Sequence, residues 1–327
     1  MNKSVQDQSF ILKAYSLDKK NFSQKLELKE LSKETKSSKL DWVHLDANKK
    51  ETKEWLSKEC KYLDSIIINA LLAEETRPRV EKINDGIFLI VRCVNLNKDS
   101  EEQDLVSIRM WIDENRIISL QKRSAKSIDD IEKLIVSGQE IEDSGEFLCL
   151  LLSHIFKRFE SVLAELDDEM DEVEEKLIDN PNPDLRSDLI DIRMKAIAFR
   201  RYMVPQRDAV SNLRSIGLTW IDNFYQRQLQ ENYDQLLRYV EDLDAMRERS
   251  QIIKEELTNA LSDKMNKNMY ILSVIASVFL PLTFLTGLLG VNVSGIPGAE
   301  SSNAFFVFCF SLIFLVFLQI VIFRKLK

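Results

Sequence analysis

Two long apolar runs near the C-terminus dominate the pattern of hydrophobic and polar positions along this chain of 327 residues. They cover residues 269–289 and 304–323, and neither contains a charged side chain. Each is about 20 residues long, the length an α-helix needs to cross the roughly 30 Å hydrocarbon core of a bilayer. The pattern therefore predicts two transmembrane helices joined by the short connector 290–303.

Shorter apolar runs with the alternation typical of β-strands lie between residues 40 and 123. Residues 42–46 alternate like a half-buried strand, and 79–97 and 104–123 each contain a turn signal, which predicts two antiparallel hairpins. Early in the second hairpin, apolar residues alternate with Ser107, Arg109 and Trp111, so we expect one face of that strand to be buried and the other to be wetter. The short patch 10–15 predicts an edge strand.

Helical spacing appears at 52–56, 66–72 and 127–136, and it dominates after residue 147. Strands flanked by helices, then helices alone, predict an α+β cytoplasmic domain joined to a helical extension. Residues 147–156 are apolar but too short to span a bilayer, which favours a buried core helix. The tract 165–177, with eight acids and one base, is either a solvated helix face or an antenna that concentrates cations.

The sequence Asn180-Pro181-Asn182-Pro183 predicts a chain reversal after this acidic tract. Arg193, Arg200 and Arg201 on the returning helix are expected to pair with the acids of the outgoing one. From residue 218 to 280 there is neither glycine nor proline, which predicts an uninterrupted helix on the order of 90 Å long at 1.5 Å per residue. Its apolar seam suits packing on neighbouring helices, including those of other subunits.

These patterns predict the following organisation along the chain. It comprises a poorly defined segment 1–38, a cytoplasmic α/β domain with acidic helical arms 39–217, a stalk helix 218–268, a first span 269–289, an external loop 290–303, a second span 304–323 and a basic tail 324–327.

The distribution of charge sets the expected orientation in the membrane. Basic residues precede the first span and follow the second, at Lys264, Lys267, Arg324, Lys325 and Lys327, whereas the connector has none. The positive-inside rule then predicts that both termini face the cytoplasm. We expect the membrane to be the inner (cytoplasmic) membrane of the cell. Without residues 269–327 the chain has 42 bases and 52 acids, a net charge of −10, which argues against nucleic acid as a partner and is compatible with cations.

Catalytic and metal-ligating patterns are weak in this sequence. The four cysteines lie far apart, there are only two histidines, and neither a phosphate-binding loop nor a nucleophile–base pair stands out. His44, inside a predicted strand, is expected to be a core or turn histidine. The N-terminus lacks a basic leader followed by an apolar core, so we expect no signal peptide. We therefore expect neither an enzyme nor a resident cofactor.

One face of the first span has the chemistry of an ion passage. Polar ends at Asn266 and Thr283 enclose apolar positions, which suits a narrow pore that closes by dewetting, but small residues are equally typical of helix packing. Since two helices cannot enclose a pore, the first interpretation requires an oligomer. The residues of this face are Asn266, Met269, Leu272, Ala276, Leu280, Thr283 and Gly287. The second span, rich in phenylalanine, is expected to face lipid.

The triplet Gly290-Val291-Asn292 follows this face at the end of the span. A helix C-terminus presents unpaired carbonyl groups, and the side chain of Asn292 adds another carbonyl oxygen, so a ring of such groups would hold a hydrated divalent cation through its waters. Glu300, the only charged residue of the connector, either attracts cations or is a solvated loop residue.

The triplet and its lead-in resemble the CorA superfamily of divalent-cation channels and transporters, in which a Gly-Met-Asn triplet ends the first of two C-terminal spans. The lead-in through Pro281-Leu282-Thr283-Phe284 is similar to that family's pore helix. Val291 stands in place of methionine, and with Gly295-Ile296-Pro297-Gly298 it resembles the zinc-transporting ZntB branch. The same resemblance is carried by Trp42-Val43-His44-Leu45-Asp46, Glu75-Thr76-Arg77-Pro78-Arg79, Val94-Asn95-Leu96-Asn97 and Val106-Ser107-Ile108-Arg109-Met110-Trp111.

The resemblance implies a homopentamer with a funnel of α/β/α sandwich domains, a stalk helix lining the pore and an outer ring of second spans. It implies that Gly290, Val291 and Asn292 form the selectivity mouth, and that Glu231 matches an acid which helps to bind a regulatory cytoplasmic metal. Zn²⁺ is the implied transported ion, with Cd²⁺, Ni²⁺, Co²⁺ and Mg²⁺ as alternatives, and coupling to protons stays open. There are two competing interpretations. One is a magnesium, cobalt or nickel channel of the same superfamily, and the other is a membrane-anchored coiled-coil scaffold without transport.

Overall fold

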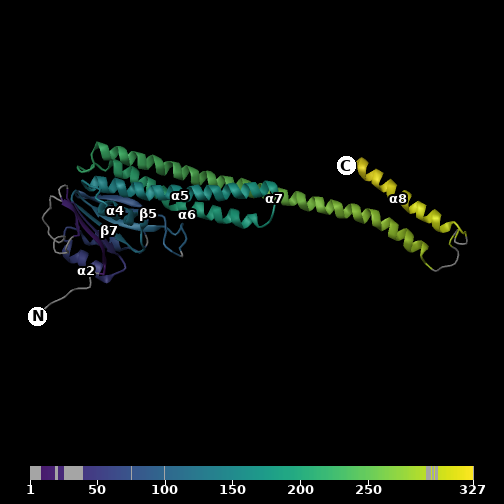
Figure 1. Cartoon of the computed structure of the whole chain (residues 1–327), viewed down its shortest axis with the longest axis horizontal. Coiled ribbons are helices and arrows are strands. Elements are labelled where there is room, and N and C mark those ends of the chain that lie inside the picture. The colour runs from purple at the N-terminus through teal and green to yellow at the C-terminus, as the bar shows by residue number, and fades with distance from the viewer. Residues whose placement is uncertain are drawn as a thin grey trace. The chain divides into compact units, whose positions relative to one another are not determined.

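The computed structural model describes residues 9–18, 21–25, 40–74, 76–98, 100–291, 296, 298 and 301–326. It divides into two compact units, one formed by Met1–Asn180 with Asp184–Lys254 and the other by Pro181–Pro183 with Glu255–Lys327. Figure 1 shows the order of their helices and strands.

A seven-stranded mixed sheet forms the centre of the first unit, in the order β2-β1-β3-β7-β6-β5-β4. Neighbouring strands are antiparallel except for β3 and β7, which are parallel. The strands are β1 Ile11–Asp18, β2 Asn21–Lys25, β3 Leu40–Asp46, β4 Arg79–Ile83, β5 Gly86–Cys93, β6 Val106–Ile112 and β7 Arg116–Gln121. The strand expected around residues 10–15 exists, but the expected edge position was wrong, because β1 pairs with β2 on one side and β3 on the other.

Both predicted hairpins are confirmed, and turn chemistry explains each. Asn84 adopts a positive φ of 55° between β4 and β5, a conformation that asparagine tolerates better than most residues. Gly86 follows, and a Cβ there would lie 2.8 Å from the carbonyl oxygen of Ile112, so only glycine fits without movement. Between β6 and β7, the Asp113 carboxylate accepts bonds from the backbone N–H groups of Asn115 and Arg116 at 3.0 and 2.8 Å.

Helices cover both faces of the sheet and make an α/β/α sandwich (Figure 1). On one face, α2 (Lys50–Glu59) and α3 (Ser65–Leu72) pack into a core that includes Leu45, Leu71, Phe88 and Ile90. On the other, α5 (Ser144–Asp179) reaches β3, where the rings of Phe147 and Trp42 lie 5.1 Å apart between centroids.

Coverage on both sides corrects the prediction for the first strand of the second hairpin. All seven residues of β6 are buried, including Ser107, Arg109 and Trp111, which were expected to be wetter. The alternation in sequence is real, but the face that was expected to be wetter is covered as well, and its Trp111 packs into the core shared with α2 and α3.

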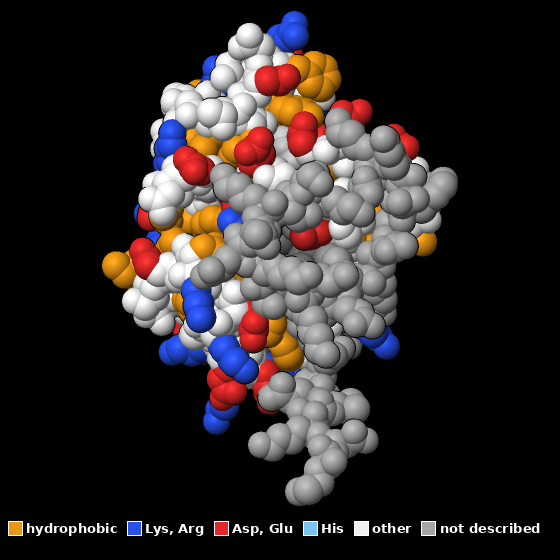
Figure 2. Space-filling view, turned by 90° about the vertical axis from the view of Figure 1, so that its left-hand side faces the viewer, with side chains coloured by type: hydrophobic (Ala, Val, Ile, Leu, Met, Phe, Trp, Pro, Cys, Tyr) orange, Lys and Arg blue, Asp and Glu red, His pale blue; other side chains and the backbone are white. Residues whose placement is uncertain are grey.

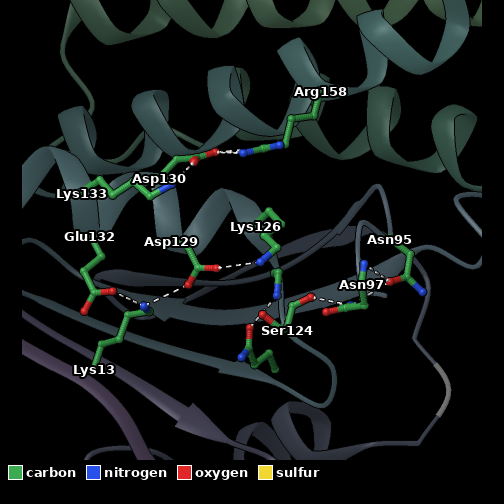
Figure 3. A network of polar contacts seen from close by, with 12 residues as sticks. Lys13, Asn95, Asn97, Ser124, Lys126, Asp129, Asp130, Glu132, Lys133 and Arg158 are labelled. Atoms are coloured by element: carbon green, nitrogen blue, oxygen red, sulfur yellow. Dashed lines mark hydrogen bonds and ion pairs between the residues drawn. The ribbon is translucent and has the colours of Figure 1, made fainter. Parts of the chain in front are cut away.

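Helix α4 (Lys126–Val136) is attached to its neighbours by ion pairs (Figure 3). Lys13 of β1 donates to Asp129 at 3.0 Å and also contacts Glu132. On the opposite side of α4, Arg158 of α5 donates to the carboxylate of Asp130 at 2.9 and 2.5 Å. Since these side chains are partly buried, the pairs fix α4 between the sheet and α5 more firmly than exposed pairs would.

The long helices α5 and α6 (Leu185–Ser215) reverse at the predicted Asn-Pro-Asn-Pro break. The predicted pairing of the returning arginines with the acids of α5 was wrong. Arg193 donates to Gln251 at 3.0 Å, Arg200 pairs with Asp244 at 2.6 Å, and the guanidinium of Arg201 lies 5.7 Å from the centroid of the Tyr202 ring. The first two partners belong to α7, so these arginines join α6 to α7 instead.

Helix α7 runs from Asn223 to Leu289 and α8 from Ala304 to Leu326. The expected start at residue 218 was five residues early, because the Asp222 side chain accepts from the N–H groups of Phe224 and Tyr225 and caps the helix. Each of the two helices contains a segment long and apolar enough to cross a membrane, as predicted.

Candidate ion-conduction site

The seven predicted pore-lining residues all lie on α7, and all are exposed in the single chain. Met269, Leu272 and Leu280 expose 57%, 67% and 71% of their surface. Such exposure of large apolar side chains requires lipid or another protein chain to cover them.

One side of this part of α7 is less exposed than the other. The partly covered positions are Val274, Val278, Pro281, Leu282 and Leu285, which recur at helical spacing. With 3.6 residues per turn, this covered strip lies about half a turn away from the predicted pore face. The pore-face residues therefore point away from the partly covered strip, which is the geometry needed if this face of α7 lines a passage.

The triplet begins where α7 ends. The N–H of Gly290 donates to the carbonyl of Thr286 at 2.9 Å and completes the last helical turn. A Cβ on Gly290 would lie 2.9 Å from that same oxygen, so the chain leaves the helix too tightly for a side chain. Val291 is half exposed, while Asn292 and Glu300 fall outside the described residues. Their proposed roles in ion binding and attraction stay predictions.

A hydrogen bond joins the two apolar helices at a residue that the sequence interpretation treated as lipid-facing. Nε2 of Gln319 on α8 donates to the backbone carbonyl of Ser277 on α7 at 3.1 Å. The signal available in the sequence was an amide side chain within a largely apolar span.

The acidic face of α5 is partly neutralised within the chain. Arg249 of α7 pairs with Asp171 at 2.5 Å, with Asp167 at 3.5 Å and with Glu174, and Lys195 pairs with Glu169 at 2.8 Å. These pairs support the interpretation of this tract as a structural and solvated face. Figure 2 shows charges of both signs interspersed with apolar side chains on one face of the molecule.

A cavity of about 620 Å³ remains beside these arms, and its lining is rich in carboxylates. They belong to Glu101, Glu169, Glu172, Asp188 and Asp191. Close by, burial and the neighbouring carboxylate of Glu165 raise the pKa of Glu102 above its ordinary value. Within the described residues, no group of three His, Cys, Asp or Glu side chains has the geometry to hold a metal ion.

The two remaining sequence candidates have different surroundings. Glu231 is exposed on α7, so a regulatory metal at this position stays a prediction. His44 is completely buried, and its Nδ1 lies 2.8 Å from the Ser119 hydroxyl oxygen. Burial lowers the pKa of His44 to about 4, which keeps the ring neutral. His44 is therefore a core histidine, as expected.

An α/β/α domain continued by a long helix, with two apolar helical segments separated in sequence by a connector that begins with a Gly-x-Asn triplet, defines a class of two-span membrane proteins with a large extramembrane domain. The chain belongs to the CorA-like Mg²⁺ transporter protein family, whose model matches residues 37–325.

Curated relatives and solved structures agree with this assignment. The chain is 37% identical over 280 residues to the zinc transport protein ZntB of Pectobacterium carotovorum, covering 86% of this chain and 85% of that protein. It is 35% identical to ZntB of Yersinia enterocolitica, covering 84% of each chain. Among solved structures, full-length CmaX is 29% identical with a TM-score of 0.83 over 99% of both chains. The CorA magnesium transporter of Methanocaldococcus jannaschii is 21% identical with a TM-score of 0.79, covering 96% of this chain and 98% of that one.

Proposed function

We propose that this chain is one subunit of a homopentameric divalent-cation transporter, with Zn²⁺ as its principal ion. The observation that carries the proposal is the exposed face of α7 that lies opposite the partly covered strip and leads to Gly290. Five such faces around one axis would enclose a passage, polar at its ends and apolar between, with Gly290, Val291 and Asn292 at its mouth.

The choice of zinc is supported by the names of the curated relatives, which are zinc transport proteins. The distribution of basic residues on either side of the spans supports an orientation with both termini in the cytoplasm, and we place the protein in the inner membrane. The proposal assigns no enzymatic activity to the chain.

Ion flux into liposomes tests the role of the triplet. Purified protein is reconstituted around a zinc-sensitive dye, and initial zinc flux is compared for wild type, Asn292→Ala and the control Asn303→Ala. Asn303 is a suitable control because it is also an asparagine of the connector, but it lies at the opposite end, directly before α8. We expect at least a fivefold loss for Asn292→Ala and less than a twofold change for Asn303→Ala. Equal flux through wild type and Asn292→Ala would overturn the role of Asn292.

A magnesium channel is the second candidate, favoured by the description of the family model. The same liposomes distinguish the two when zinc and magnesium compete. Zinc flux that persists in a large excess of magnesium supports the zinc assignment, whereas dominant magnesium flux removes it.

A further inference from the structure

Pro281 creates an unpaired carbonyl in the first apolar helix. In an α-helix the N–H of each residue bonds to the carbonyl four positions earlier, and proline has no N–H. The carbonyl left without its helical donor is therefore that of Ser277. In a membrane no bulk water is present to satisfy this group, so another donor must reach it.

The structure supplies that donor from the second apolar helix. Nε2 of Gln319 lies 3.1 Å from the carbonyl oxygen of Ser277. A carbonyl oxygen only accepts, so the amide must present its nitrogen rather than its oxygen to Ser277. Its other polar atom, Oε1, is buried and has no partner within the described part of the chain.

We propose that Gln319 is a positioning residue which replaces the backbone donor that Pro281 removes, and thereby fastens α8 to α7 at the proline. Helix α7 remains helical beyond Pro281 as far as Leu289. The contact therefore sets the direction of residues 282–289, the segment that carries the pore face to Gly290. We call the set Ser277, Pro281 and Gln319 the proline latch.

The latch makes a prediction that simple side-chain packing does not. If Gln319 acts by satisfying the Ser277 carbonyl, then restoring a backbone N–H at position 281 should make Gln319 dispensable. If Gln319 only fills space between helices, its replacement should cost the same whether residue 281 is proline or not. A double-mutant cycle separates these cases.

The cycle compares wild type, Gln319→Leu, Pro281→Ala and the double variant as purified full-length protein in one detergent. Gln319→Leu is expected to lower the unfolding midpoint by roughly 2–4 °C in the wild-type background. In the Pro281→Ala background the same change should lower it by less than about 1 °C. Ser311→Ala is the matched control, because the Ser311 hydroxyl bonds to the Phe308 carbonyl within α8, so its loss should be the same in both backgrounds.

Equal losses from Gln319→Leu in both backgrounds, or no loss in wild type, would overturn the latch. Gln319→Met and Pro281→Leu repeat the cycle if either first variant does not fold, since methionine also lacks the donor and leucine also restores the N–H. Zinc flux is a second readout that rests on the proposed function. Zinc flux through Gln319→Leu should be at least threefold lower than through wild type. Zinc flux through the double variant should be less than 1.5-fold lower than through Pro281→Ala. If wild type moves no zinc, the proposed function fails while the thermal cycle still decides the latch.

Discussion

At the scale of single residues, Gly290 has the most restricted surroundings near the end of α7. An added Cβ would lie 2.9 Å from the Thr286 carbonyl oxygen, closer than carbon and oxygen normally approach, whereas a Cβ at Gly287 would meet no atom within 4 Å outside the neighbouring backbone of its own helix. The first contact is with backbone, so relief requires the last helical turn to move.

Gly290→Ala is therefore expected to destabilise the full-length protein by about 1–3 kcal/mol, the usual range when an added methyl group forces the backbone to shift. Gly287→Ala should cause no loss in the same denaturation assay. An unchanged unfolding midpoint for Gly290→Ala would contradict this prediction, because it would mean that a Cβ fits beside the Thr286 carbonyl at the end of α7. Zinc flux through Gly290→Ala should fall as well, because the same shift displaces the mouth residues.

Single residues also show where inference from sequence succeeded and where it did not. His44 was correctly expected in the core, because this placement depends on the strand to which it belongs. The triplet and the pore face stay predictions. The role of Gln319 was missed because its partner, the Ser277 carbonyl, lies 42 residues away and carries no side-chain signal. Backbone groups left unpaired by a proline are found only by asking which residue should have bonded to them.

At the scale of elements, Arg249 joins α7 to α5 through three carboxylates. Arg249→Met keeps much of the aliphatic length but removes the charge, and it leaves Asp167, Asp171 and Glu174 to repel one another. We expect a loss of about 1 kcal/mol, because the side chains are partly exposed and solvent screens them.

The size of this loss should depend on salt. Screening weakens surface ion pairs, so the difference in unfolding free energy between wild type and Arg249→Met should shrink between 0.05 and about 1 M NaCl, as the Debye length falls to roughly 3 Å. Lys176→Met is the control, because its pair with Glu172 lies within α5 and joins no two helices. A loss from Lys176→Met as large as that from Arg249→Met would contradict the bridging role.

Element types were predictable here, but their partners were less so. Strands, hairpins and helices follow from periodicity and turn residues. The burial of both faces of β6 and the pairing of the α6 arginines with α7 depend on which helix lies alongside, and periodicity in one segment contains no information about its neighbour. The start of α7 was missed because the cap at Asp222 was read as part of a stretch free of glycine and proline.

At the scale of the whole molecule, the proposed pore requires five copies of the chain. One subunit has a mass of 38.0 kDa, so the protein component of the assembly in detergent should weigh about 190 kDa. Light scattering corrected for bound detergent, or native mass spectrometry, measures this mass. A monomer or dimer would instead favour the membrane-anchored scaffold, because neither encloses a passage.

The parallel pairing of β3 with β7 has a consequence for synthesis. This pairing joins residues 41–46 to residues 116–121, so the sheet cannot close until β7 has left the ribosome. The first apolar span follows about 150 residues later. At roughly 5–20 residues per second, that interval lasts about 8–30 s. The sheet can therefore close before the first apolar span is synthesised and enters the membrane. In a nascent chain stalled before residue 269, strands β3 and β7 should already be protected from protease.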